Sequence, residues 1–307
     1  MSENPYYSLN DYFKGKYRTR VQRIAVSLPF KCPHTEQDGS GGCTYCHKGS
    51  MPAGADTQVP LALQIMKGIE HGRKRYGHST KFMVYFQAYT NTNAPVEELK
   101  ALYDEAMNHQ DVIGISAGTR PDCAGDEVLK LLDSYYGRGF ESWIELGLQS
   151  ANNRTLARIN RRHTVEDFID AVKRAKMTRL RIAAHMIVGL PGEGTADFLE
   201  TARLLAALKV HAVKIHPLHV MKGTAMGDEY MKKPFKILAL EEYVSALADI
   251  TEVLPPDMIM MRYTSEANDG VLLAPDYCRP EFKMTIRQML MDELKRRGTR
   301  QGSKIVP

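Results

Sequence analysis

The feature that most constrains the fold is an alternation of short apolar runs with longer amphipathic stretches along most of the chain. Such alternation is typical of repeated β-α units around a parallel sheet. It predicts six strands, at residues 23–28, 82–87, 113–118, 143–148, 181–188 and 212–218. The helices that it predicts span residues 59–76, 96–108, 126–136, 165–177, 195–208, 238–253 and 281–297. No G-x-G-x-x-G follows the first strand, which disfavours a dinucleotide-binding sheet. We therefore expect an α/β fold, a partial (β/α)6 TIM-type barrel with short N- and C-terminal additions.

No Pro-, Gly- or Ser-rich linker divides this body, and 43% hydrophobic with 25% charged residues is typical of a globular protein. We expect a basic, aromatic N-terminal extension at residues 1–20, a barrel at 21–235 and a C-terminal helical extension at 236–307 that packs on the barrel. No apolar run approaches the roughly 18 residues that span a bilayer, and residues 1–16 lack the apolar region of a signal peptide. These observations predict a cytoplasmic protein with no membrane partner.

Three of the five cysteines, Cys32, Cys43 and Cys46, lie within fifteen residues, in the Gly-rich loop after the first predicted strand. In a barrel, the loops after the strands carry the reactive groups. One interpretation is a structural zinc with His34 or His47 as fourth ligand. The other is an iron–sulfur cluster with one iron open to a small molecule, which three cysteines without a fourth favour.

Further segments carry a resemblance to a known family. The cysteine loop, with Tyr45 before the last cysteine, and the β-α body resemble the radical SAM enzymes. ELGLQS at 145–150, LARINRRH at 156–163 and HMIVGLPGE at 185–193 resemble the branch that includes the Elongator catalytic subunit and coproporphyrinogen dehydrogenase. FQAYTNT at 86–92 and APDYC at 274–278 are similar to the YhcC/YtqA-like group of that branch.

The resemblance implies a 4Fe–4S cluster on Cys32, Cys43 and Cys46, with S-adenosylmethionine (SAM) on the open iron. Reductive cleavage of SAM would give a 5′-deoxyadenosyl radical, with the electron from a donor such as flavodoxin or ferredoxin. It also implies that Tyr45 presents its backbone to the adenine and that Arg161 pairs with the methionine carboxylate.

Four further residues are expected to bind the cofactor. Gln149 would contact the ribose or methionine end, and Gln87 occupies the place of the Gly-Gly-Glu element of other radical SAM enzymes. Strand periodicity turns Glu145 and Gln149 to one side and His185 to the inner face of its own strand. Alternatively, Glu145 pairs with Lys214 across the barrel and His185 is an ordinary core residue.

The two ends of the chain are basic. Residues 1–25 carry a net charge of +3 and residues 279–307 a net charge of +5, around a body of −3. Near the N-terminus, aromatic residues interleave with the cations: Tyr6, Tyr7, Tyr12, Phe13 and Tyr17. Charge for phosphates with rings for stacking suits single-stranded RNA. With the Elongator-like relationship, this predicts tRNA as partner and its wobble uridine as substrate. The alternatives are a radical SAM enzyme that acts on a small metabolite and a non-catalytic, zinc-stabilised RNA-binding protein.

Overall fold

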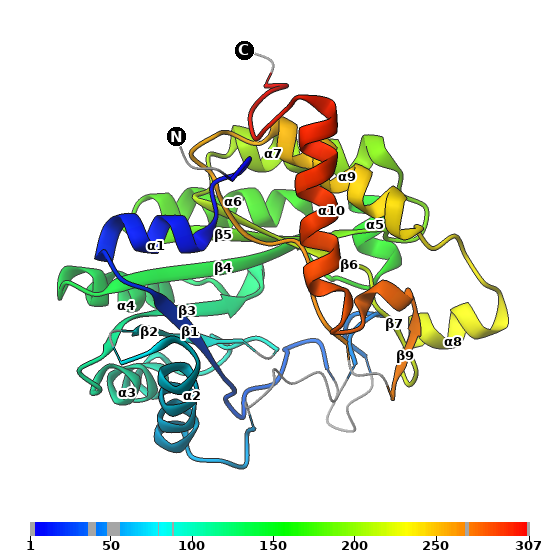
Figure 1. The fold of residues 1–307 in the computed structure, drawn as a ribbon. Coiled ribbons are helices and arrows are strands. Elements are labelled where there is room, and N and C mark those ends of the chain that lie inside the picture. The colour runs from blue at the N-terminus through cyan, green and yellow to red at the C-terminus, as the bar shows by residue number, and fades with distance from the viewer. Residues whose placement is uncertain are drawn as a thin grey trace.

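A computed structural model describes residues 4–35, 41–47, 56–78, 80–87, 89–267 and 270–305. Its main element is a seven-stranded sheet of order β1-β2-β3-β4-β5-β6-β8, parallel throughout. The strands are β1 (Val21–Val26), β2 (Lys81–Phe86), β3 (Val112–Thr119), β4 (Glu141–Gln149), β5 (Arg181–Val188), β6 (Ala212–Pro217) and β8 (Ile259–Arg262). The sheet curves into a half-barrel (Figure 1). The predicted partial TIM-type barrel is thus confirmed.

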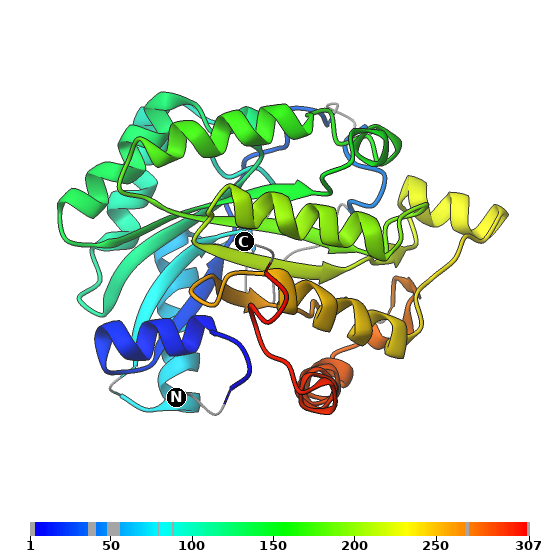
Figure 2. The ribbon, with the colours of Figure 1, turned by 90° about the horizontal axis from the view of Figure 1, so that it is seen from above.

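Helices cover the outer side of the curved sheet, as Figure 2 shows from above. They are α2 (Leu61–Tyr76), α3 (Val96–Met107), α4 (Asp126–Gly137), α6 (Val165–Lys176), α7 (Thr195–Ala207) and α9 (Leu240–Val253). Their apolar faces and the outward side chains of the strands form the largest hydrophobic core. Burying that face is what holds such amphipathic helices on a sheet.

The structure has one more strand in the sheet than the six that we predicted. β8 pairs in parallel with β6, from Ala212 opposite Ile259 to Lys214 opposite Arg262. At four residues, it is too short to show a strand periodicity. The segment expected as a helical extension therefore also contributes to the sheet, followed by α10 (Phe282–Arg297), which packs on α9.

An unpredicted helix, α1 (Leu9–Tyr17), covers the end of the barrel at which the strands begin. Its Tyr12 and Phe13 are buried against the first residues of several strands, among them Val21, Trp143 and Ile259. Tyr12 also contacts the Trp143 ring edge-on, with centroids 5.8 Å apart. The N-terminal segment thus completes the core of the half-barrel.

The segments around Tyr7 and Gln301, near the two ends of the chain, lie side by side. The side chain of Gln301, which is buried, accepts a hydrogen bond from the Tyr7 amide at 2.8 Å and donates to the Met258 carbonyl at 2.7 Å. The remaining short elements are α5 (Asn153–Arg158), α8 (Ala225–Lys232), the antiparallel pair β7 (Val220–Met221) and β9 (Leu272–Ala274), and the 3-10 turns η1 (Pro121–Cys123) and η2 (Asp276–Cys278). Among the described helices, none is both long and apolar enough to cross a membrane.

Candidate active site

The cysteine loop lies where the strands end, beside α5 and α8. Thr44 binds both neighbours, since its amide donates to the Ile159 carbonyl at 3.0 Å and its carbonyl accepts from the Met226 amide at 2.9 Å. Cys46 closes a turn by donating its amide to the Cys43 carbonyl at 3.0 Å. Desolvation, with the charges of Cys43 and Cys32, raises the pKa of Cys46 to about 11. The three thiols therefore share one electrostatic environment, while residues 36–40 of the loop lie outside the described residues.

The side chain of Arg161 joins this loop to the sheet. Its Nη1 donates to the Cys43 sulfur at 3.5 Å, its Nη2 to the Gly147 carbonyl at 2.8 Å, and its Nε to His163 at 2.9 Å. Burial works to lower the pKa of Arg161, but the charges of Tyr45 and Cys43 outweigh it and the pKa is raised. A fixed positive charge consequently faces the thiols.

Glycine at position 147 makes room for this arrangement. A Cβ there would lie 2.5 Å from Arg161 Nη2 and 2.7 Å from Gln149 Nε2. The strand also bulges after Gly147, and Gln149 has a left-handed φ of 78°. Bulges near strand ends re-aim side chains. The regular alternation expected through Gln149 is therefore interrupted, yet its amide still lies over Gly147, next to Arg161.

Two more of the expected cofactor residues are Gln87, at a strand end, and Tyr45, in the cysteine loop. Gln87 directly follows β2, and its amide donates to the Val26 carbonyl of β1 at 3.1 Å. Tyr45 packs against a hydrophobic cluster that contains Leu156, Leu218 and Leu190, the last from the Gly189–Gly192 segment. That segment is a turn with left-handed φ at both glycines.

A second loop, after β3, supports the thiol site and was not identified from the sequence. Asp122 accepts from the Arg120 Nε at 2.9 Å and lies 2.8 Å from His34 Nε2. Arg120 in turn donates to the Arg161 carbonyl at 2.6 Å. These bonds connect the cysteine loop with the Arg161 segment. The only hint in the sequence is that Arg120-Pro-Asp122 directly follows a strand.

The described side chains do not form a site for a single zinc ion at the thiols. His34, one of the two possible fourth ligands of a zinc ion, contacts Asp122 instead of a thiol. In the described residues, no three His, Cys, Asp or Glu side chains are grouped closely enough to hold one metal ion.

Glu145 and His185 lie deeper, on the inner face of the barrel. Glu145 is fully buried and accepts hydrogen bonds from Ser116 at 2.6 Å, His185 at 2.8 Å and Lys214 at 3.4 Å. It also forms an ion pair with Arg23. Burial opposes its ionisation, but Arg23 and Lys214 outweigh burial and hold the pKa of Glu145 well below its ordinary value. The Glu145–Lys214 pair, which we gave as the alternative to cofactor binding, is present, so the carboxylate helps to hold the inner face of the barrel together.

Three of the five N-terminal aromatic residues that we expected to stack on RNA are buried within the protein, while Tyr7 and Tyr17 are half-buried. Tyr6, Tyr12 and Phe13 are buried, and the Tyr6 ring packs edge-on against Tyr263 at 5.0 Å. Aromatic rings contribute most to stability when they are buried in a hydrophobic core. Tyr12 and Phe13 of α1 are part of such a core at the end of the barrel where the strands begin.

Many terminal cations are also paired. Lys16 forms an ion pair with the buried Glu141, and Arg20 lies 3.7 Å over the Tyr76 ring. At the other end, Arg297 binds Asp249 at 2.6 Å and Lys304 binds Glu252 at 2.6 Å. The net charge of the two ends is therefore less accessible than the sequence indicates.

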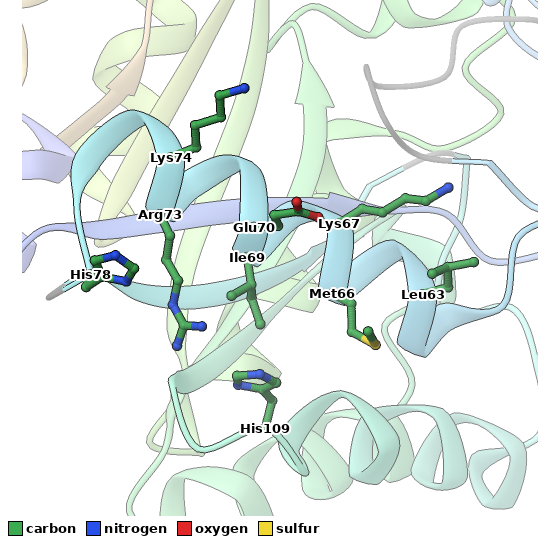
Figure 3. A pocket seen from close by; sticks show the side chains of 9 residues that line it. All are labelled: Leu63, Met66, Lys67, Ile69, Glu70, Arg73, Lys74, His78 and His109. Atoms are coloured by element: carbon green, nitrogen blue, oxygen red, sulfur yellow. The ribbon is translucent and has the colours of Figure 1, made fainter.

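A groove of about 610 Å³ lies outside the barrel, on α2 and the end of α3 (Figure 3). Leu63, Met66 and Ile69 line it together with charged side chains and His109. None of the cofactor residues predicted above lines this groove. It therefore belongs to the outer surface and not to the candidate active site.

Family comparisons bear on this arrangement. Residues 37–205 match the Radical SAM superfamily, and residues 210–292 match the Radical SAM C-terminal domain. Protein MJ0486 of Methanocaldococcus jannaschii is 36% identical over 297 residues, which is 95% of this chain and 90% of that protein. YtqA of Bacillus subtilis is 33% identical and covers 98% of this chain and 93% of its own length.

More distant likenesses extend to Elongator proteins. A protein named tRNA uridine(34) acetyltransferase, from Methanocaldococcus infernus, is 24% identical over 287 residues, covering 76% of this chain and 50% of its own length. The solved structure of Elp3 from M. infernus superposes with a TM-score of 0.63 at 19% identity, over 92% of this chain and 64% of that one, and shows a shared fold. The family match covers more than half of the chain, and the close relatives are similar over nearly all of it. The chain therefore belongs to the radical SAM superfamily, and its cofactors are a 4Fe–4S cluster and SAM.

Proposed function

We propose that this enzyme holds its cluster on Cys32, Cys43 and Cys46, binds SAM against Arg161 and Gln149, and modifies a tRNA wobble uridine by a radical route. The observation that carries the cofactor part is the position of Arg161, whose buried guanidinium contacts both the Cys43 sulfur and the last part of β4. When bound, the cluster and SAM supply the radical that takes a hydrogen atom from the substrate, after reduction by a donor such as flavodoxin or ferredoxin.

The residues present fit these groups. Three thiols are soft ligands for iron, and a guanidinium matches a carboxylate with two parallel N–H groups. Beside them, Thr44 Oγ1 and Arg120 Nη1 are buried with no hydrogen-bond partner among the described residues. Buried polar atoms are almost always satisfied, so a polar bound group is the natural partner of such atoms.

Each protein residue has a role in holding the cofactor. Arg161 would exchange its contact with Gly147 for the methionine carboxylate, and Gln149 beside it would donate its amide to the methionine or ribose end. Tyr45 would offer its backbone to the adenine, while the apolar residues packed on its ring exclude water. Gln87, at the end of β2, would contact the methionine amino group.

His185 and Glu145 form the boundary between cofactor and substrate. His185 is partly exposed, and burial together with the charge of Lys214 lowers its pKa to about 4, so its ring is neutral at pH 7. A neutral ring that donates its Nε2 hydrogen to Glu145 leaves Nδ1 to accept one hydrogen bond from SAM. Glu145 would act on the cofactor through His185.

Two observations support tRNA as the substrate. One relative is named tRNA uridine(34) acetyltransferase, and this name refers to a uridine of tRNA, the nucleoside class proposed here as substrate. Exposed cations without an ion pair among the described residues remain at both ends of the chain, at Lys14, Arg18, Lys295 and Arg300. A single-stranded anticodon loop could present its base to the barrel without the cost of unstacking a duplex.

One observation favours a second candidate, a small anionic metabolite. Three of the five aromatic residues that would stack on RNA are buried, and several terminal cations are paired within the protein. The same cofactor chemistry would then act on a molecule that fits inside the barrel.

The cofactor part is tested by anaerobic reconstitution of wild type and Cys43→Ala, with Cys278→Ala as the control. Cys278 is buried beside Leu218 and is not one of the proposed cluster ligands, so its loss should leave iron and sulfide content unchanged. Wild type should contain iron and acid-labile sulfide and release 5′-deoxyadenosine from SAM, and Cys43→Ala should do neither. Stoichiometric zinc without iron in wild type would contradict the proposal.

The substrate part is tested by mass spectrometry of tRNA nucleosides from cells with and without the protein. Loss of a modified uridine, restored by wild type but not by Cys43→Ala, is the expected result. An unchanged nucleoside profile would leave the small metabolite as the substrate class.

A further inference from the structure

The inner face of the barrel carries a layer of polar side chains, one from each of the seven strands. We call this set the inner polar layer: Arg23, Tyr85, Ser116, Glu145, His185, Lys214 and Arg262. Lys214 Nζ bridges Tyr85 at 2.8 Å and Glu145 at 3.4 Å. Strands of a parallel sheet are normally apolar on both faces, so packing alone does not explain this layer.

The inner polar layer holds more positive than negative charge. Arg23, Lys214 and Arg262 surround the single carboxylate of Glu145. Burial lowers the pKa of Lys214 to about 7, and of the nearby charges, that of Glu145 opposes this shift while those of Arg23 and Arg262 add to it. Even with Lys214 only partly charged at pH 7, Arg23 and Arg262 carry two charges against the one of Glu145, and uncompensated buried charge is costly.

Part of this positive charge has no partner. The Arg262 guanidinium makes no hydrogen bond or ion pair with the described residues, and Arg23 Nε is buried without a hydrogen-bond partner. Two donor groups, from the two edge strands β8 and β1, are thus open to an acceptor from outside the protein.

Solvent can reach this layer. Arg23, His185, His216 and Arg262 are partly exposed, whereas the strand residues that face the outer helices, such as Ile215, are buried. Water therefore reaches the concave face of the sheet between β1 and β8.

The layer meets the place proposed for SAM at His185, and Arg262 lies beyond that place. Arg161 binds the carbonyl of Gly147, and His185 is the residue opposite Gly147 on β5. Arg262 lies on β8, three strands from β4 in the sheet, which is about 14 Å at the usual strand spacing. A carboxylate of SAM at Arg161 therefore leaves Arg262 for another molecule.

We propose that the inner polar layer binds an anionic group of the substrate, a phosphate or a carboxylate, through Arg262 and Arg23. This inference rests on the proposed radical SAM function and adds the chemical class of the substrate. Arg262 is the residue to test, because Arg23 also stabilises Glu145. In tRNA the anion would be a phosphate next to the reacting nucleoside, and in a small metabolite it would be a phosphate or a carboxylate.

The experiment is anaerobic calorimetry on reconstituted holoprotein with SAM, at constant ionic strength. The probes are inorganic phosphate, acetate, uridine 5′-monophosphate and uridine. Wild type, Arg262→Gln and Arg262→Lys are compared, with Arg203→Gln as the matched control, because Arg203 is exposed on α7 and has no ion pair among the described residues. Circular dichroism checks that each variant is folded.

Saturable binding of at least one anion by wild type, weakened tenfold or more in Arg262→Gln but less in Arg262→Lys, is the expected result. Binding of phosphate and the monophosphate, but not uridine, would assign a phosphate-bearing substrate, and binding of acetate would assign a carboxylate. No anion binding, or equal loss in Arg203→Gln, would overturn the inference. Wild-type SAM cleavage is measured in parallel, so that active cleavage without anion binding contradicts this inference alone.

Discussion

The Nη1 of Arg161 lies 3.5 Å from the sulfur of Cys43, 118 residues earlier in the chain. This contact brings the thiols of the loop and the end of β4 into one place. The same guanidinium also binds the Gly147 carbonyl, because glycine leaves space for it on the strand. The backbone of β4 thus positions Arg161.

Replacing Arg161 with alanine should weaken SAM binding by about 2–5 kcal/mol, because a buried carboxylate would lose its charged partner. Calorimetry of SAM binding to reconstituted protein measures the effect. Arg162→Ala is the matched control, since its side chain is exposed and, among the described residues, hydrogen-bonds only to Asn160. Equal SAM affinity of wild type and Arg161→Ala would show that another group holds the methionine carboxylate.

Replacing Glu145 with glutamine should destabilise the fold by about 3–5 kcal/mol, because Arg23 and Lys214 would remain buried without a countercharge. Urea unfolding of the unreconstituted protein measures this difference. Glu229→Gln, which breaks an exposed pair with Arg158, should change the free energy of unfolding by less than about 1 kcal/mol. If Glu145→Gln lowered the free energy of unfolding by less than about 1 kcal/mol as well, Arg23 and Lys214 would have to find other partners in the variant.

Glu193 should make stability depend on pH. Burial raises the pKa of its carboxyl to about 7, although Ser150 and Thr155 donate hydrogen bonds that lower it. The folded state therefore favours the protonated form, and this stabilisation is complete below pH 4.5 and is lost as pH rises through 7. The shift corresponds to up to about 3 kcal/mol.

Unfolding of wild type and Glu193→Gln across pH 4.5–8 isolates this contribution. The comparison needs the variant, because the lowered pKa of His185 makes stability change with pH in the opposite direction. The difference, wild type minus variant, should fall with increasing pH. A constant difference would show that Glu193 titrates at an ordinary pKa in the folded protein.

Reversing two exposed cations should reduce tRNA affinity if the N-terminal end contacts tRNA. Lys14→Glu with Arg18→Glu removes two unpaired positive charges. The negative slope of log affinity against log salt concentration should therefore become shallower by about 2. Lys173→Glu with Lys176→Glu, on the outer helix α6, is the control for net charge. Filter binding across a salt series gives both slopes, and equal slopes for the two double variants would argue against a specific contact.

The sequence alone was sufficient for six of the seven strands of the barrel sheet and for the helices that cover its outer side. Each of the six predicted strands lies within a few residues of an observed one, since apolar runs and helical periodicity are local properties that burial on a sheet requires. The cysteine spacing and the segments around Gln149, Arg161 and Gly189–Gly192 also indicated the family, which the comparisons confirm. These signals depend only on residue order.

The tertiary structure decided the features in which residues from separate strands meet. β8 is a strand because the edge of β6 offers it partners, not because four residues show a pattern. The same basic, aromatic N-terminal sequence would suit an RNA surface or a core helix, and the open end of the barrel buries Tyr12 and Phe13. Strand periodicity alone turned Glu145 inward, but the register of parallel strands, set by packing of distant segments, brought Arg23 and Lys214 to it.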